Sequence, residues 1–182
     1  LLAQSISPND GGGACVCLRC RALDPEGYLE PSSGAPALSD RYIYFFNKVA
    51  EIVSEEFPDR HLAYLVYSDY SRAPVKHTEL HPMIVPVFAP IRYPRLHSMF
   101  NPLSEQNIRL RNEIEKYARY AKHIGYYGYN YNLAETIVPF SKIGIWSRDL
   151  PWLCERGLFQ ATLETLGNWN TNGPHAYLSA RY

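Results

Sequence analysis

Short runs of apolar residues alternate along the chain with longer stretches in which apolar positions recur every three or four residues. The short runs predict strands and the longer stretches predict amphipathic helices. The strands that this pattern predicts cover residues 1–7, 62–70, 83–91, 124–131 and 158–163. The helices that it predicts begin at Ser39 or Asp40, at Ser104, at Ser147 and at Asn172. Pro86 falls inside one predicted strand, where its missing N–H is awkward if the strand is central.

Strands that are separated by helices are expected to pair in parallel, so this order of elements predicts an α/β fold. An open doubly wound sheet and a (β/α)8 barrel both fit the alternation, but two features favour the barrel. The glycine run at 11–13 lacks the spacing of a phosphate-binding loop. Polar or aromatic residues follow the end of every predicted strand, which is where a barrel builds its active site. We therefore predict a TIM-type (β/α)8 barrel.

A complete barrel takes about 250 residues, whereas this chain has 182. The chain begins with LLAQSIS inside a predicted strand and ends with HAYLSARY inside a predicted helix. We therefore expect a fragment: residues 1–182 would form a single partial barrel domain. It would hold the C-terminal portion, the last five of eight strands, without the N-terminal strands.

Composition narrows the classes of partner. The chain carries 18 basic and 18 acidic residues, so it has no net charge that would favour nucleic acid or an anionic membrane. No apolar run approaches the roughly 18–20 residues of a membrane span. The 15 tyrosines, four of them in HIGYYGYNYN at 123–132, instead suit a surface that is half apolar and half hydrogen-bonding.

Several motifs resemble one family. They are PND followed by CVCLRC, the helix SDRYIYFFNKVAE, and the strand end YSDYSRAP. Together they resemble DUF4838, a family of unknown function whose members are large bacterial proteins similar to glycoside hydrolases. The resemblance runs over essentially the whole chain. It implies a glycosidase-type barrel with strands four to eight present, in a secreted, periplasmic or cell-surface protein, and it names no substrate.

Glycoside hydrolysis uses two carboxylates that flank the scissile bond. Glu164 is the first candidate, because it follows LFQATL directly and lies between apolar neighbours. Asp10, just past the first predicted strand, and Asp69, in YSDYSRAP, are candidates for the second. The alternatives are a structural ion pair for Glu164, an ordinary turn for Asp10 and a sugar-binding role for Asp69. Asp149 instead suits the first turn of a helix.

Aromatic rings and amide or phenol tips supply the rest of a sugar site. Strand alternation places Tyr127, Tyr129 and Tyr131 on one face and Tyr126, Gly128 and Asn130 on the other, so only one set can face a ligand. The substrate-binding candidates are Tyr67, Tyr70, Arg92, Tyr131, Asn132 and Trp169. Arg92 could hold an acidic sugar through a bidentate contact, or could be a structural ion-pair partner.

Three thiols occur within six residues, at Cys15, Cys17 and Cys20. They can bind a structural zinc ion, with Cys154 or a histidine as a fourth ligand. A disulfide and free thiols are the alternatives. No cofactor is otherwise required. The sequence thus predicts a carbohydrate-active protein of glycoside hydrolase type, with a non-catalytic carbohydrate-binding protein and a zinc-stabilised interaction module as alternatives.

Overall fold

Five parallel strands form one curled sheet in the order of the chain, β1-β2-β3-β4-β5. The structure is a computed structural model that describes residues 3–131, 141–165 and 169–181. The strands are β1 (Gln4–Ser5), β2 (Leu62–Val66), β3 (Ile84–Phe88), β4 (Ile124–Tyr129) and β5 (Leu158–Glu164). The helices are α1 (Leu18–Arg21), α2 (Ser39–Glu56), α3 (Glu105–Tyr117), α4 (Ile143–Cys154) and α5 (Trp169–Ser179), with a 3₁₀ turn η1 (Ser68–Tyr70) after β2.

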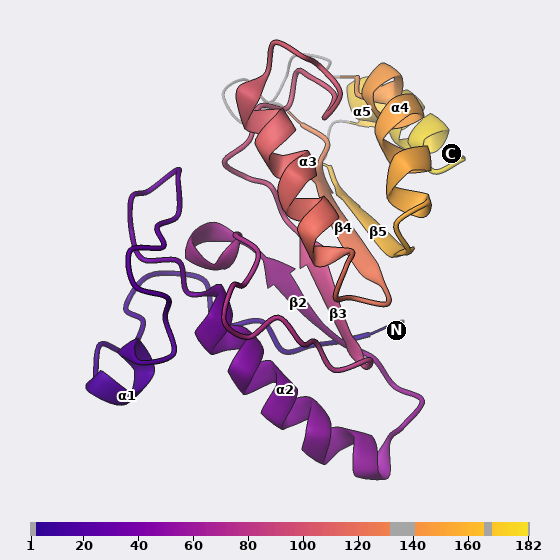
Figure 1. Cartoon of the computed structure of the whole chain (residues 1–182). Helices are drawn as coiled ribbons and strands as arrows, with labels where there is room; N and C mark the ends of the chain where they lie inside the picture. The colour runs from indigo at the N-terminus through magenta and orange to yellow at the C-terminus, as the bar shows by residue number, and fades with distance from the viewer. Residues whose placement is uncertain (1–2, 132–140, 166–168, 182) are drawn as a thin grey trace.

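Helices α2, α3 and α4 cover one face of the sheet (Figure 1). Each is fixed by an aromatic pair with the strand beneath it: Phe46 with Tyr64 at 4.5 Å between ring centroids, Tyr117 with Phe88 at 5.3 Å, and Trp146 with Tyr126 at 5.5 Å. These rings belong to the large hydrophobic core. Burial of such rings is a main source of stability in an α/β protein.

The opposite face of the sheet has its own small apolar cluster. Ala63, Val85 and Val87 are buried there, with Leu65 and Phe159 packed against them. Parallel strands in sequence order, with the helices on one face and a separate layer of side chains on the other, are the arrangement of a (β/α)8 barrel. The prediction of part of a TIM-type barrel is confirmed, and this second face is the barrel interior.

Pro86 lies in the middle of β3, between β2 and β4. The N–H of Ala89 donates to the carbonyl of Val66 on β2, so the odd-numbered residues of β3 bond to β2. Pro86 therefore directs its nitrogen toward β4, and the paired residues of β3 and β4 begin only at Val87. A proline is tolerated here because it stands where that ladder has not yet begun.

Strand β5 contains a bulge opposite the start of β4. Ile124 pairs with Leu158, but Gly125 pairs with Gln160, so Phe159 is an extra residue. A bulge exchanges the two faces of all later residues in the strand. Leu158 and Leu163 consequently both pack on the helix side, and Glu164 lies on the barrel interior.

Helix α2 starts where it was predicted, but the capping role of Asp40 and the predicted start of α4 are wrong. Helix α2 begins at Ser39, but Asp40 does not cap it: its carboxylate accepts from the backbone N–H groups of Val75, Lys76 and His77, at 3.2, 2.6 and 2.7 Å. Helix α4 begins at Ile143, so Ser147 lies inside it rather than at its cap. Asp40 is thus bound by a loop distant in sequence, whereas the Ser147 hydroxyl donates to the carbonyl of Gly144 within α4 itself.

Asp149 and the last helix also differ from prediction. Asp149 lies in the second half of α4, not its first turn, and is buried. It accepts from the Ser98 hydroxyl at 2.5 Å and from the Met99 N–H at 3.2 Å, so it holds a loop rather than a helix end. Helix α5 begins at Trp169 and not at Asn172, which leaves Pro174 inside it. Among the described residues, no helix is both long enough and apolar enough to cross a membrane.

Candidate functional site

The carboxyl ends of the strands gather the candidate residues at one end of the sheet. Glu164 ends β5, Tyr129 ends β4, and η1 with Asp69 follows β2. In a parallel barrel this end carries the reactive groups, because all strands point toward it and the loops that follow them are free to vary. Two features lie here: a cluster of tyrosines around Glu164, called the Tyr–Glu cluster below, and a cavity lined by two aspartates, called the acidic cavity.

The Tyr–Glu cluster consists of Tyr127, Tyr129, Tyr131 and Glu164. The Tyr127 phenol donates to Oε2 of Glu164 at 2.8 Å, and the Tyr131 phenol donates to Oε1 at 2.8 Å. Each carboxylate oxygen thus has its own donor from the neighbouring strand. The structural ion pair that was the alternative role for Glu164 is absent among the described residues, which provide these two neutral donors instead.

The three tyrosines share one face of β4, as the alternation predicts, and Glu164 of β5 lies on that same face. Tyr127 and Tyr129 have ring centroids 5.3 Å apart, and Tyr129 and Tyr131 6.5 Å. On the other face Asn130 accepts from the Trp146 indole N–H at 3.2 Å. Gly128 lies under the same indole, with no room for a side chain. The division of β4 into a helix-facing set and an interior-facing set is confirmed.

The carboxylate changes the acidity of its donors. Burial, followed by the hydrogen bond to Glu164, raises the pKa of Tyr127 to about 12. The same two causes raise the pKa of Tyr131 above its ordinary value. Both phenols therefore stay protonated and remain donors at neutral pH. Two donors fix the carboxylate in one orientation and occupy part of its accepting capacity, which suits a nucleophile or base better than a proton donor.

The acidic cavity lies between the loop after β1 and the end of β2. It has a volume of about 250 Å³. Asp10 and Asp69 both line it, together with Tyr67 and Tyr70. Four of the residues singled out in the sequence thus share one hollow, although they come from segments about 60 positions apart.

The two aspartates have different surroundings. Asp10 is exposed, and its one bond within the described residues is from the N–H of Gly11, at 3.0 Å. Asp69 accepts from the Ser33 hydroxyl at 3.0 Å and from Arg92 at 3.2 Å. Ser68, just before it, has a left-handed φ of 52°, which is unusual for a residue other than glycine and is found most often near functional sites.

Tyr67 connects the two groups. Its ring packs against the ring of Tyr70, with 6.4 Å between their centroids, and both residues line the acidic cavity. After burial, Tyr67 and then Glu164 are the largest causes that raise the pKa of Tyr129, so both lie near that phenol. Glu164 itself is not one of the residues that line the acidic cavity. The three predicted carboxylates thus lie at the same end of the barrel but do not share one cavity.

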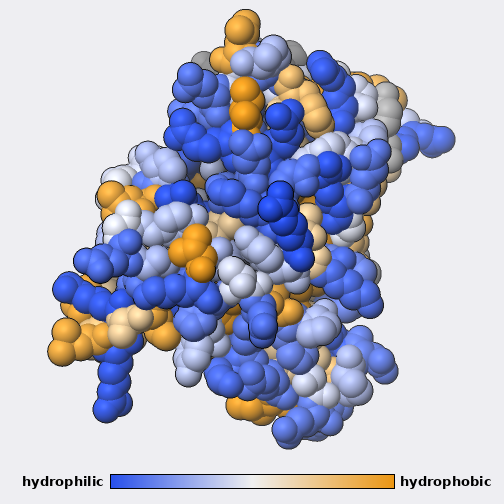
Figure 2. Space-filling model, in the orientation of Figure 1, coloured by the Kyte–Doolittle hydropathy of each residue, from blue (hydrophilic) through white to orange (hydrophobic). Residues whose placement is uncertain are grey.

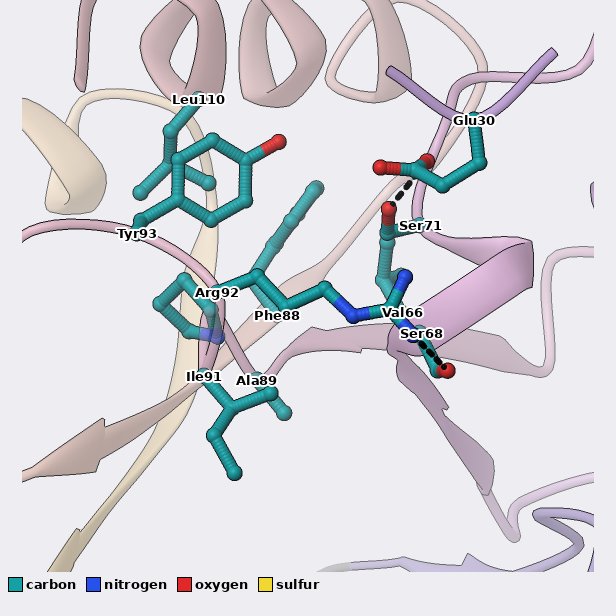
Figure 3. Close-up of a pocket in the computed structure, with 11 residues that line it drawn as sticks. Glu30, Val66, Ser68, Ser71, Phe88, Ala89, Ile91, Arg92, Tyr93 and Leu110 are labelled. Carbon is teal, nitrogen blue, oxygen red and sulfur yellow. Dashed lines mark hydrogen bonds between the residues drawn. The ribbon is translucent and has the colours of Figure 1, made fainter. Parts of the chain in front are cut away.

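Arg92 follows β3 and is tied to this end of the barrel by several bonds. It donates to Ser32 at 3.0 Å, to Ser68 at 2.9 Å and to Asp69 at 3.2 Å. Figure 3 shows its guanidinium extended toward Ser68. The ion pair is about a third exposed on both sides, at 35% and 36%. The structural role that the sequence left open for Arg92 is present, and the exposed part of the group can still meet a ligand.

The buried position of Glu30 could not be predicted from the sequence. It is 2% exposed and lines the same small pocket as Arg92 (Figure 3). Its carboxylate accepts from the hydroxyls of Ser32 at 2.9 Å and Ser71 at 2.8 Å. No spacing pattern marks a glutamate in a loop as buried. The two serines, which come from different loops, show that it joins the loop before α2 to the loop after η1.

The remaining candidates lie apart from these groups. Trp169 begins α5 and is 65% exposed, so it is not packed into a site by its neighbours in the described chain. Asn132 lies outside the described residues. The sulfur atoms of Cys15, Cys17 and Cys20 all lie within 4.8 Å of one another, and none of these cysteines lines the acidic cavity.

Comparisons with known proteins identify a family but no function and no site residue. A family model described as "Domain of unknown function (DUF4838)" matches residues 2–182. No curated protein and no solved structure matches the chain.

Proposed function

The chain belongs to the DUF4838 family, and we propose that its barrel acts on a carbohydrate, with Glu164 as the main catalytic carboxylate. The observation that carries the proposal is the pair of phenol donors, one to each oxygen of Glu164, both at 2.8 Å. A carboxylate held in this way at the carboxyl end of a barrel strand is oriented for attack on a sugar carbon or for activation of water.

The surroundings of Glu164 support a sugar as the ligand. Tyr127, Tyr129 and Tyr131 form a row of rings on its face, and Tyr67 continues the row toward the acidic cavity. Apolar ring faces pack against sugar C–H groups, and phenol tips exchange hydrogen bonds with sugar hydroxyls. A row of this kind can bind an oligosaccharide along its length.

The second carboxylate would come from the acidic cavity. Asp69 already accepts from Arg92 and Ser33. Asp10 accepts only from its own neighbour, and the glycines at 11–13 that follow it allow it to move. We therefore place Asp10 as the proton donor and Asp69 as a group that binds sugar hydroxyls. Arg92, with a third of its side chain exposed, could bind a carboxylate-bearing sugar.

A non-catalytic carbohydrate-binding protein is the second candidate. It is favoured by one observation: Glu164 does not line the cavity that holds Asp10 and Asp69. In this alternative the tyrosine row binds a sugar, and no acid pair acts on it. A bacterial secreted or surface location, which the family resemblance suggests, suits both candidates.

The test is a panel of aryl glycosides and polysaccharides, assayed for turnover and for binding by calorimetry. Wild type, Glu164→Gln and the control Glu155→Gln are compared, because the Glu155 side chain is 74% exposed and distant from the strand ends. Turnover that is lost only in Glu164→Gln supports the proposal. Turnover that survives in Glu164→Gln refutes the assignment of Glu164. Binding without turnover in wild type favours the second candidate.

A further inference from the structure

The segment from Ala14 to Asp24 has little to hold it in place by burial. Helix α1, Leu18–Arg21, has no buried residue. Val16 is 69% exposed and Leu18 is 87% exposed. In Figures 1 and 2 this segment stands out from the rest of the molecule, with apolar and charged groups both at its surface. Polar contacts from Arg41 and Lys76 bind the end of the segment at Asp24. Apolar burial does not stabilise the turn that carries the thiols, so that turn has room for a further stabilising interaction.

Three thiols converge in this same segment. Cys15, Cys17 and Cys20 are free, and their sulfur atoms lie within 4.8 Å of one another. In a tetrahedral zinc site, with Zn–S bonds of about 2.3 Å, neighbouring sulfurs are about 3.8 Å apart. Small side-chain rotations bring the three sulfurs to that spacing. A turn of helix between Cys17 and Cys20 already places them on one side, since the N–H of Arg21 donates to the carbonyl of Cys17 at 3.0 Å.

Charged groups around the thiols fit a bound cation with several thiolates. Three thiolates on one Zn²⁺ carry a net charge of about −1, because three negative charges exceed the two positive charges of the ion. Arg19 and Arg21 belong to the same helical turn. Arg41 of α2 donates to the backbone carbonyl of Cys15 at 2.6 Å and pairs with Asp24. Because Asp24 already balances Arg41, the guanidinium groups of Arg19 and Arg21 are the ones that offset the negative charge.

We propose that Cys15, Cys17 and Cys20 bind one zinc ion as thiolates. Binding converts the three thiols to thiolates and releases their protons to solvent. A water molecule takes the fourth position of the tetrahedron, because the thiols are at the surface. Cys154 is not the fourth ligand: it ends α4, and Figure 1 places α4 on the opposite side of the molecule from α1.

The zinc ion would fix one wall of the acidic cavity. Asp10 lies five positions before Cys15, and the glycines at 11–13 lie between them. Ala14, next to Cys15, lines the acidic cavity itself. Arg41 joins Cys15 and Asp24 to α2, so the metal site, the loop and the helix form one connected unit. The site is structural and does not depend on what the barrel binds.

The test uses the wild-type protein and reads each cysteine separately. The protein is purified under reducing conditions, incubated with ZnCl₂, freed of excess metal and alkylated with iodoacetamide, and each cysteine is quantified by peptide mass spectrometry. We expect about one zinc per chain by elemental analysis. We also expect Cys15, Cys17 and Cys20 to be protected at least about tenfold against alkylation until EDTA is added. Cys154 is the internal control, because it is exposed and reacts equally with and without EDTA.

Two further measurements complete the test. Co²⁺ in place of zinc gives visible bands of a tetrahedral thiolate site, and Cys20→Ser removes them while Cys154→Ser leaves them unchanged. If Cys20→Ser does not fold, the alkylation pattern of the wild type still shows whether the three cysteines bind zinc. Equal alkylation of all four cysteines with zinc present overturns the proposal. A disulfide-linked peptide among the three, or zinc that remains after Cys20→Ser, overturns it as well.

Discussion

The Tyr127 phenol donates a hydrogen bond to Oε2 of Glu164, 2.8 Å away, between two neighbouring strands of the barrel. Tyr131 does the same for Oε1. The two bonds hold the carboxylate between the ends of β4 and β5, so its position depends on both strands. Removing either phenol is therefore the most specific way to disturb Glu164 without changing its charge.

Tyr127→Phe and Tyr131→Phe should each lower kcat/KM for a carbohydrate substrate by a factor of about 10–100, since a hydrogen bond to a charged group contributes about 1.5–3 kcal/mol. Steady-state kinetics on the best substrate of the panel measures the effect. The matched control is Tyr44→Phe, because Tyr44 is exposed on α2. If both strand variants retain full activity, Glu164 is not positioned by these phenols.

The hydrogen bond to Glu164 should also be visible in the titration of Tyr127. Burial and the bond to the carboxylate raise the pKa of this phenol to about 12. In Glu164→Gln the negative charge is gone, so the pKa of Tyr127 should fall toward its ordinary value of about 10. The measurement is a pH titration of tyrosine ring ¹³C signals by NMR, with Tyr127→Phe used to assign the resonance.

The same shift has a defined effect on stability. Because the folded pKa of Tyr127 is above the unfolded value, its contribution to stability is complete below about pH 10 and is lost as pH rises toward about 12. Urea unfolding across this range should give a free energy of unfolding that falls with pH, and less steeply in Tyr127→Phe. An equal slope in the variant would show that folding does not raise the pKa of this phenol.

The parallel strands and the two faces of β4 could be predicted from the sequence. The alternation of apolar patterns predicts the parallel strands, and period-two spacing correctly separates the tyrosines of β4 into two faces. The face of the sheet on which Glu164 lies could not be predicted from the sequence. It depends on the bulge at Phe159, and an extra residue leaves no mark in a strand as short as LFQATLE. Counting from Leu158 without the bulge places Glu164 under the helices.

The partners of two buried aspartates also could not be predicted from the sequence. Asp40 and Asp149 both look like residues of a helix first turn, yet each accepts hydrogen bonds from a loop more than 30 positions away. Local spacing cannot reveal such partners. The buried Glu30, held by Ser32 and Ser71, escapes prediction for the same reason.

The contacts of Asp40 predict a large cost of removal. It is fully buried and its carboxylate accepts from three backbone N–H groups. Asp40→Ala should lower the free energy of unfolding by about 3 kcal/mol or more, because it leaves buried donors without an acceptor. Asp69→Ala is the comparison: its partner Arg92 is a third exposed, so its loss should cost at most about 1 kcal/mol. Chemical denaturation measures both, and equal costs would contradict this difference in burial.

Two glycines near Trp146 should respond in opposite directions to alanine. A Cβ at Gly128 would lie 2.8 Å from Cζ2 of Trp146, so Gly128→Ala forces the indole to shift and should destabilise by about 1–3 kcal/mol. Gly144, near the start of α4, is exposed and has nothing within 4 Å of the same position. Gly144→Ala should stabilise by about 0.5–1 kcal/mol. Thermal unfolding of the two variants checks the packing of α4 on β4.

The most direct test of the central claim asks which carboxylate meets a bound sugar. An epoxyalkyl glycoside based on the sugar that binds best is incubated with the protein. A carboxylate oxygen next to the bound sugar opens the epoxide and forms an ester, and the new alkoxide takes up a proton. Peptide mass spectrometry then locates the ester. We predict a single ester at Glu164, blocked by excess free sugar. A sugar-blocked ester at another carboxylate, with Glu164 unmodified, would contradict the account.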